Sequence, residues 1–295
     1  MKKLSTGDKV FNGVNYTMMI ILSIVTLYPF LNVLAISLND SLDTVKGGIT
    51  IFPRAFTFAN YINILNNQVI VKSAGVSVLR TAAGTLFGIL STAMVAFVIS
   101  REDFFARKFV TTVFIVTMYV SGGMIPDYML IRSLHLMNNF GVYILPGLIS
   151  VFNVIVLRTF IEGLPYELQE SAKLDGANDF TIFIRIIFPL CTPVIATLSL
   201  FIAVGQWNSW FDTYLYCGGS KVLSTLQFEL QKILMNSQST SRDIYGTTSE
   251  IMANRVSPES IRMAMTIIAT VPILVVYPFV QGYFVKGLTI GAVKS

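Results

Sequence analysis

The sequence predicts an all-α membrane protein that crosses the bilayer about six times, and two observations support this prediction. Hydrophobic residues make up 54% of the 295 positions and charged residues only 13%, about half the charged share of soluble domains. Several stretches also approach the roughly 20 apolar residues that a helix needs to cross the hydrocarbon core. We therefore expect a single transmembrane domain over residues 1–295, with no separate soluble domain.

The apolar stretches mark the expected spans. The third is the weakest, because Gly122, Gly123 and Pro126 shorten it. Pro29 and Pro272 fall within spans, where neighbouring helices can satisfy the freed carbonyl groups. The first stretch has a cleaved signal peptide as its alternative interpretation, but its apolar run exceeds the 7–15 residues of a signal sequence. The six expected spans are 14–38, 71–100, 109–124, 141–160, 188–211 and 261–284.

Basic residues indicate the orientation of these spans. If both termini are cytoplasmic, the inner segments 1–13, 101–108, 158–187 and 285–295 hold eleven Lys and Arg residues in 62 positions. The outer segments 39–70, 125–140 and 212–260 then hold seven in 97 positions. Cytoplasmic loops of membrane proteins carry an excess of basic residues. The bias therefore predicts cytoplasmic termini and a cytoplasmic loop between the fourth and fifth spans.

That loop, residues 162–189, is a polar and charged segment in an otherwise apolar chain. Pro165 predicts a helix start, because proline suits the first helical position. Gly176 predicts the end of that helix in a left-handed conformation. Asn178 or Asp179 can cap a second short helix. These features by themselves are also typical of an ordinary amphipathic loop.

The spacing of landmarks in the loop resembles a known family. Glu170-Ser171-Ala172, Gly176, Ile186 and Pro189 follow the pattern of the cytoplasmic "EAA loop" in permease subunits of ATP-binding-cassette (ABC) importers. Ser171 and Phe188 depart from the usual Ala and Leu. The segment from Tyr283 to Lys294 resembles the tail of the carbohydrate-uptake, MalG-like branch. Three further stretches fit the same pattern, namely Tyr28-Pro29-Phe30, Phe58-Ala59-Asn60-Tyr61 and Trp207-Asn208-Ser209-Trp210.

The resemblance covers nearly the whole chain, and the long loop after the fifth span is similar to that of the LplC-like subgroup. It implies the type I importer permease fold, in a multi-pass protein of the bacterial inner or plasma membrane that imports a carbohydrate, in particular an oligosaccharide. The implied partners are a second permease subunit, an ABC ATPase dimer, an extracellular or periplasmic sugar-binding protein and membrane lipid. The chain is expected to bind no cofactor, since its ATPase partner uses the ATP. The residues implied to couple to the ATPase are Glu170, Ser171, Ala172, Asp175, Gly176, Ile186 and Pro189.

Polar residues within spans are candidates for the substrate path, because burying them in a membrane is costly. Amide groups suit sugar hydroxyls, and indole rings can stack on sugar rings. The tryptophans have an interfacial aromatic belt as their alternative, and the partner permease could carry the whole sugar site. Arg80 either extends to the membrane surface or pairs with an acid such as Asp212. The candidates for the path are Asn153, Gln206, Trp207, Asn208 and Trp210.

The sequence lacks the residues that other classes of function require. The sequence has no phosphate-binding G-x-x-x-x-G-K-(S/T) loop, so it cannot hydrolyse ATP. Cys191, Cys217 and His135 are too few and too scattered for a metal site, and no catalytic constellation or basic block points to an enzyme or to nucleic acid. A secondary sugar or ion transporter is the alternative function. It is disfavoured because no acidic residue falls in the middle of a span.

Overall fold

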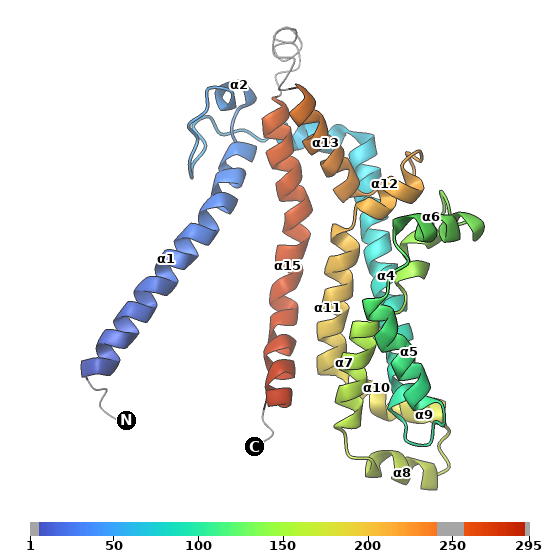
Figure 1. Cartoon of the computed structure of the whole chain (residues 1–295). Helices are drawn as coiled ribbons and strands as arrows, with labels where there is room; N and C mark the ends of the chain where they lie inside the picture. The colour runs from blue at the N-terminus through green and yellow to red at the C-terminus, as the bar shows by residue number, and fades with distance from the viewer. Residues whose placement is uncertain (1–5, 241–256, 293–295) are drawn as a thin grey trace. The chain divides into compact units, whose positions relative to one another are not determined.

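The computed structural model describes residues 6–240 and 257–292, and the regular secondary structure of these residues is helical apart from an isolated bridge between Asn39 and Phe56. The chain forms two compact units, and Figure 1 labels most of their helices. The first draws on residues up to Gln68 and on Leu230–Val271, and the second on Val69–Glu229 and the chain from Pro272 onward. The prediction of an all-α fold is confirmed within these residues.

The helices, in chain order, are α1 (Thr6–Ser37), α2 (Ser41–Thr44), α3 (Ala59–Asn66), α4 (Gln68–Ser100), α5 (Arg107–Tyr119), α6 (Met124–Ser133), the 3₁₀ turns η1 (Phe140–Tyr143) and η2 (Leu145–Gly147), α7 (Val151–Glu162), α8 (Glu167–Leu174), α9 (Asp179–Ile182), the π-helix η3 (Phe183–Ile187), α10 (Phe188–Leu190), α11 (Thr192–Asn208), α12 (Phe211–Cys217), α13 (Leu226–Thr240) and α15 (Pro258–Ala292).

Three described helices are long and apolar enough to cross a membrane, namely Gly7–Ser37, Gln68–Ser100 and Pro258–Pro278. Three more candidates are bent pairs, so the described residues hold up to six spans. The expected span 109–124 ends early, since α5 stops at Tyr119 and α6 turns away by 119°. Gly123 (φ +88°) and Pro126 explain this bend, because the first adopts a left-handed backbone and the second lacks an amide donor.

The other two bent pairs also shift the expected boundaries. The span expected at 141–160 begins as 3₁₀ turns around Pro146 and becomes a regular helix only at Val151, after a 47° bend. The span expected at 188–211 bends by 82° at Cys191, which lies between Pro189 and Pro193. Proline removes a helix hydrogen bond and clashes with the preceding turn, so both breaks have a local cause.

In the first unit, a buried polar network closes the loop between α1 and α3. Asn39 is fully buried, and its amide donates to Asp43 (3.1 Å) and Thr44 (3.2 Å). Asn60 Nδ2 donates to the carbonyl oxygens of Ser37 (2.9 Å) and Asn39 (3.0 Å). These bonds satisfy amides that would be costly to bury alone. They give a structural role to Asn60 in the Phe58–Tyr61 stretch.

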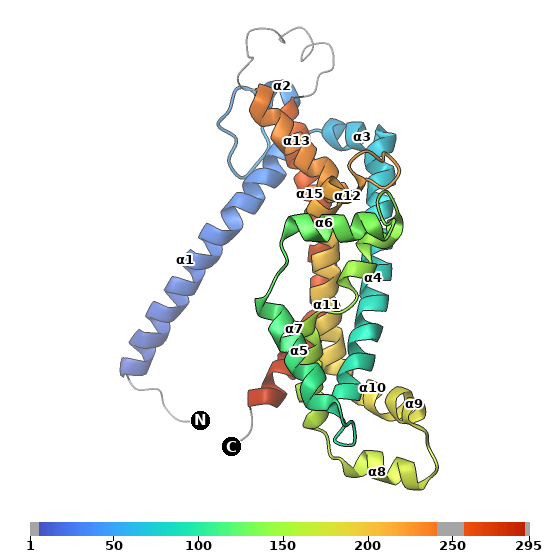
Figure 2. The same ribbon diagram turned by 45° about the vertical axis from the view of Figure 1, so that its right-hand side comes forward.

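In the second unit, α4, α7 and α11 surround the core, and the 171–191 region closes one end of it (Figure 2). Glycine lets α4 and α11 approach closely, as small residues do in membrane helices. A Cβ atom at Gly84 would lie 2.7 Å from the Gln206 side chain. In both views α8 lies at one end of this unit and α6 and α12 lie at the other. The best-buried core residues are Ala96, Val154, Leu157, Ile182, Ile187 and Leu198.

Candidate functional site

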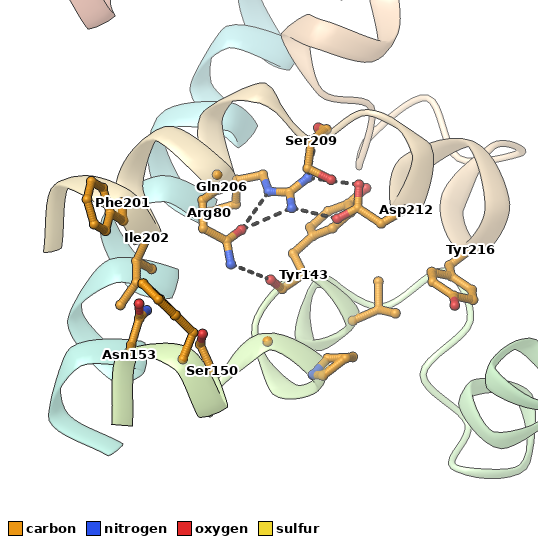
Figure 3. A pocket seen from close by; sticks show the side chains of 15 residues that line it. Arg80, Tyr143, Ser150, Asn153, Phe201, Ile202, Gln206, Ser209, Asp212 and Tyr216 are labelled. Carbon is orange, nitrogen blue, oxygen red and sulfur yellow. Dashed lines mark hydrogen bonds and ion pairs between the residues drawn. The ribbon is translucent and has the colours of Figure 1, made fainter. Parts of the chain in front are cut away.

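A cavity of about 470 Å³ lies within the second unit, between α4, α7, α11, α12 and the 3₁₀ turns before α7 (Figure 3). Phe152, Phe201 and Ile202 form part of its apolar wall. This volume and this mixture of apolar wall and few polar groups are typical of small-molecule sites. The polar residues of the lining are Arg80, Ser150, Asn153, Gln206, Ser209 and Asp212, with the hydroxyl of Tyr216 at one side.

Arg80 holds one side of the cavity together. Its side chain is only 2% exposed, and Nη2 lies 2.6 Å from Asp212 Oδ2. Nη1 donates to Asp212 Oδ1 (3.2 Å) and to the Ser209 carbonyl oxygen (3.3 Å). The Tyr143 ring lies over the guanidinium, with its centroid 4.4 Å from Cζ. Of the two alternatives for Arg80, the structure thus forms the pair with Asp212.

Gln206 is part of the same network. Its Oε1 accepts hydrogen bonds from Nε (3.1 Å) and Nη2 (3.0 Å) of Arg80. Its Nε2 donates to the Tyr143 carbonyl oxygen (3.1 Å). Figure 3 shows these bonds joining α4, α11 and η1. Gln206 lines the cavity as the sequence predicts, but the network fixes the position of its amide.

Asn153 and Ser150 occupy the opposite side, and their side chains have no hydrogen-bond partner among the described residues. Asn153 is 6% exposed, and it faces the cavity from the first turn of α7 (Figure 3). The side-chain amide of Asn153 and the hydroxyl of Ser150 line the cavity, where they are free to donate and accept hydrogen bonds. The arrangement therefore suits a ligand that brings hydrogen-bonding groups to this side of the cavity.

The remaining candidates for the path lie outside the cavity. Trp207 is 8% exposed and lines a separate apolar hollow of about 80 Å³ with Pro272 and Val276. Asn208 accepts a hydrogen bond from Gln227 (3.1 Å). Trp210 packs edge-to-face on Phe211, with ring centroids 5.7 Å apart.

Helix geometry explains why these neighbours separate, because consecutive helical residues point about 100° apart. Residues 206, 207 and 208 therefore face different surroundings. Reasoning from the sequence missed Ser150 and Tyr143. The Pro146-Gly147 pair in the sequence could have indicated them. It predicts a break in the helix just before α7, and irregular backbone at membrane depth is tolerated where it lines a cavity.

The coupling loop has the turn that its sequence predicts. α8 ends where Gly176 adopts φ +81°, and the Ala177 amide donates to the Ala172 carbonyl oxygen (2.9 Å). No atom lies within 4 Å of a Cβ placed at Gly176, so the backbone conformation, rather than crowding, favours glycine there. Asn178 caps α9, since its side chain accepts a hydrogen bond from the Thr181 amide (2.8 Å).

The candidate coupling residues divide between the core and the surface. Ala172 is buried in the core cluster and Ile186 packs against it. The first helix of the loop starts two residues later than predicted, because α8 begins at Glu167 and not at Pro165. Two large apolar side chains of the segment are exposed, Leu174 by 89% and Phe180 by 65%. The exposed members of the candidate set are Glu170, Ser171, Asp175, Gly176 and Pro189.

An ionic cluster ties the segment to the end of α4, and we call it the α4 clamp. It consists of Arg101, Asp103, Lys173 and Asp179. Arg101 lies 2.5 Å from Asp103 and 2.5 Å from Asp179, and Lys173 lies 3.2 Å from Asp103. Hydrogen bonding to Arg101 holds the pKa of Asp103 well below its ordinary value of 3.8. Asp103 therefore stays ionised at any physiological pH.

The chain matches the model of the family "Binding-protein-dependent transport system inner membrane component" over residues 1–290. The polygalacturonan/rhamnogalacturonan transport system permease protein YtcP of Bacillus subtilis (strain 168) is 35% identical over 289 residues, which cover 98% of this chain and 99% of the relative. Protein LplC of the same organism is 37% identical over 290 residues, 98% and 96% of the two chains.

A similar solved structure agrees with these relatives. It is the crystal structure of a bacterial ABC transporter involved in the import of the acidic polysaccharide alginate. The match has a TM-score of 0.86 and 25% identity, and it covers 96% of this chain and 100% of the other. Full-length matches of sequence and fold thus lead to one conclusion. The chain belongs to the family of binding-protein-dependent transport system inner membrane components, and it is a permease subunit of an ABC importer rather than an enzyme.

Proposed function

We propose that this permease subunit passes an oligosaccharide along the cavity beside Arg80, powered by a separate ATPase that docks on the 162–189 loop. The observation that carries the proposal is the buried Asn153 amide, which faces the cavity without a hydrogen-bond partner among the described residues. Sugar hydroxyls both donate and accept hydrogen bonds, so they can satisfy this amide and the nearby Ser150 hydroxyl. The names of YtcP and of the alginate transporter support a carbohydrate substrate.

The orientation and the partners follow from the same proposal. Both termini lie in the cytoplasm, as the basic residues predict. An extracellular sugar-binding protein delivers the substrate, and a second permease subunit completes the pore. An ABC ATPase dimer hydrolyses ATP, so this chain needs no cofactor of its own. In this orientation the α6–α12 end of the second unit faces outward.

The docking surface for the ATPase is the exposed side of α8 and α9. Leu174 and Phe180 expose apolar side chains there, and such exposed groups beside polar ones mark protein interfaces. Glu170 and Asp175 supply charges on the same segment. Buried Ala172 also packs this segment against the core of the second unit. A displacement of the segment by the ATPase therefore also moves the core residues that it contacts.

The α4 clamp connects a movement of the 162–189 loop to the cavity. α4 is one continuous helix from Gln68 to Ser100. The clamp joins its cytoplasmic end to both arms of the loop, through Lys173 on α8 and Asp179 on α9. The same helix carries Arg80, which lines the cavity. A movement of the loop therefore shifts the wall of the cavity.

Replacement of Asn153 tests the proposed path. Asn153→Leu keeps the volume and removes the hydrogen-bonding groups, and the lost bond to substrate is worth about 1 kcal/mol. We expect the affinity of the reconstituted importer for a tetragalacturonate probe to fall about fivefold to tenfold. Thr159→Val, a polar-to-apolar change at an exposed position of the same helix, is the matched control. Unchanged affinity in Asn153→Leu would place the sugar site in the partner permease.

A further inference from the structure

A second hollow, of about 600 Å³, lies beside the cavity at the α6–α12 end of the second unit. Tyr216 belongs to the lining of both spaces, and Figure 3 shows it at the edge of the cavity. The other rings of the hollow are Tyr128 from α6, Tyr214 from α12 and Phe228. Its volume lies within the range of small-molecule sites, and the proposed function assigns no role to it.

The aromatic rings of the hollow form two contacting pairs. Tyr128 and Tyr216 stack with ring centroids 6.2 Å apart and planes 16° apart. Tyr214 and Phe228 have centroids 6.2 Å apart, and Tyr214 is 58% exposed. Aromatic residues combine a large apolar face with, in tyrosine, a polar end. A pyranose ring has the matching structure, with an apolar face of C–H groups and a rim of hydroxyls.

The polar groups of the hollow also suit a hydroxyl-rich ligand. The hydroxyls of Tyr128, Tyr214 and Tyr216 and the side-chain amide of Asn138 have no hydrogen-bond partner among the described residues. The lining contains no charged side chain. These free hydroxyls argue against lipid as the occupant, because hydrocarbon would leave them unsatisfied.

Asn138 is held at the hollow in an unusual conformation. Its φ is +53°, in the left-handed region that asparagine occupies more readily than most residues other than glycine. The backbone N–H of Asn138 donates a hydrogen bond to the Tyr216 carbonyl oxygen (3.1 Å), which fixes this backbone against α12. Asn138 and Tyr216 thus line the hollow from two segments that this bond joins.

We propose that the hollow is a second carbohydrate subsite, which stacks the trailing pyranose units of an oligosaccharide whose leading units occupy the cavity. The inference rests on the proposed function and extends it to substrate length. A disaccharide fills the cavity alone, whereas a tetrasaccharide also reaches the hollow past Tyr216. The subsite thus gives the importer a preference for longer chains.

Binding measurements at two chain lengths test the subsite. The probes are galacturonan and maltodextrin oligosaccharides of two and four units, bound to the purified importer complex in nanodiscs without its binding protein. In the wild type we expect tighter binding of the longer probe in at least one series. Tyr128→Ala and Tyr214→Ala should weaken tetrasaccharide binding about threefold to tenfold and leave disaccharide binding unchanged. Tyr214→Phe keeps the ring and should retain most of the preference, and Tyr119→Ala, at an exposed tyrosine elsewhere, is the matched control.

Two glycine variants separate the subsite from the cavity. No atom lies within 4 Å of a Cβ at Gly219, in the hollow, or at Gly205, in the cavity. Gly219→Leu should place a bulky side chain in the hollow without strain and abolish the chain-length preference only. Gly205→Val should narrow the cavity and weaken the binding of both lengths.

The outcomes are distinguishable. The subsite is overturned if wild-type affinity does not rise with length in either series, if the tyrosine variants weaken both lengths equally, or if Gly219→Leu keeps the preference. If Gly205→Val leaves binding of both lengths intact, the cavity itself is not the sugar path, and the proposed function fails together with the subsite. An effect of Gly205→Val on both lengths with no effect of Gly219→Leu rejects the subsite alone.

Discussion

At the scale of single residues, Arg80 shows how the protein keeps a charge inside a membrane domain. All three guanidinium nitrogens donate hydrogen bonds, to Gln206, Ser209 and Asp212. A buried charge pair of this kind is costly to break, because the remaining partner is left without compensation. The pair thus positions the cavity wall, and the free groups of Asn153 and Ser150 are left for ligand.

Removing one partner of this pair should destabilise the protein. Asp212→Asn leaves the buried guanidinium without its counter-ion and should cost about 3 kcal/mol of unfolding free energy. The double variant Arg80→Met/Asp212→Asn should recover much of this loss. Thermal unfolding of the detergent-solubilised protein measures both. Glu102→Gln, which neutralises an exposed carboxylate, is the control, and equal stability of Asp212→Asn and Glu102→Gln would contradict the argument.

At the scale of elements, α4 connects the coupling loop with the cavity and depends on close packing along α11. Gly84 and Gly75 lie on the same helix but differ in their surroundings. A Cβ at Gly84 meets the Gln206 side chain, while one at Gly75 meets nothing within 4 Å. Substitutions at the two positions therefore distinguish an effect on the packing of α4 against α11 from an effect on the helix propensity of α4.

Gly84→Leu and Gly75→Leu should have opposite effects. Both gain the higher helix propensity of leucine, worth up to about 1 kcal/mol. Gly84→Leu also overpacks the α4–α11 contact at a cost of about 1–3 kcal/mol, and it displaces Gln206 from Arg80. We expect lower thermal stability and loss of uptake for Gly84→Leu, with neither in Gly75→Leu. Equal uptake by the two variants would show that the close approach has no functional role.

The α4 clamp makes a separate prediction for coupling. Arg101→Gln breaks the contacts with Asp103 and Asp179 and should raise the ATP hydrolysed per sugar imported by several-fold, with sugar affinity unchanged. Lys108→Gln removes an equal charge from the start of α5 and serves as control. A role limited to folding would instead lower the amount of assembled importer at an unchanged ratio of ATP to sugar.

The clamp should also resist acid. The pKa of Asp103 is depressed in the folded protein, so its contribution to stability is complete above the ordinary value of 3.8 and is lost only as the pH falls through the lower, folded value. The ATP-to-sugar ratio of the wild type should therefore be the same at pH 5 and pH 7. A rise in this ratio at pH 5 would show that the clamp is already protonated there.

At the scale of the whole molecule, the two ends of the second unit serve different sides of the membrane in the proposed orientation. The loop after α4 exposes Phe105 by 98%, and the loop after α12 exposes Val222 by 75%. Phe105→Cys should react with an impermeant maleimide only after the membrane is opened, whereas Val222→Cys should react in intact cells. Native Cys191 and Cys217 are buried, so the wild type supplies the background. The reverse pattern would invert the topology and remove the coupling loop from the ATPase.

Local features of the sequence determined the membrane class, the coupling loop and its turn, because they depend on composition, spacing and the conformational freedom of one residue such as Gly176. The bends at Gly123 and Cys191 also follow from nearby glycine and proline, although their angles do not. Only the tertiary structure decided which polar groups meet. Arg80 contacts Gln206 and Asp212, which lie 126 and 132 residues away in sequence, and Arg101 contacts Asp179 across 78 residues. Such contacts depend on how bent helices orient their faces, and that orientation is set by packing throughout the unit.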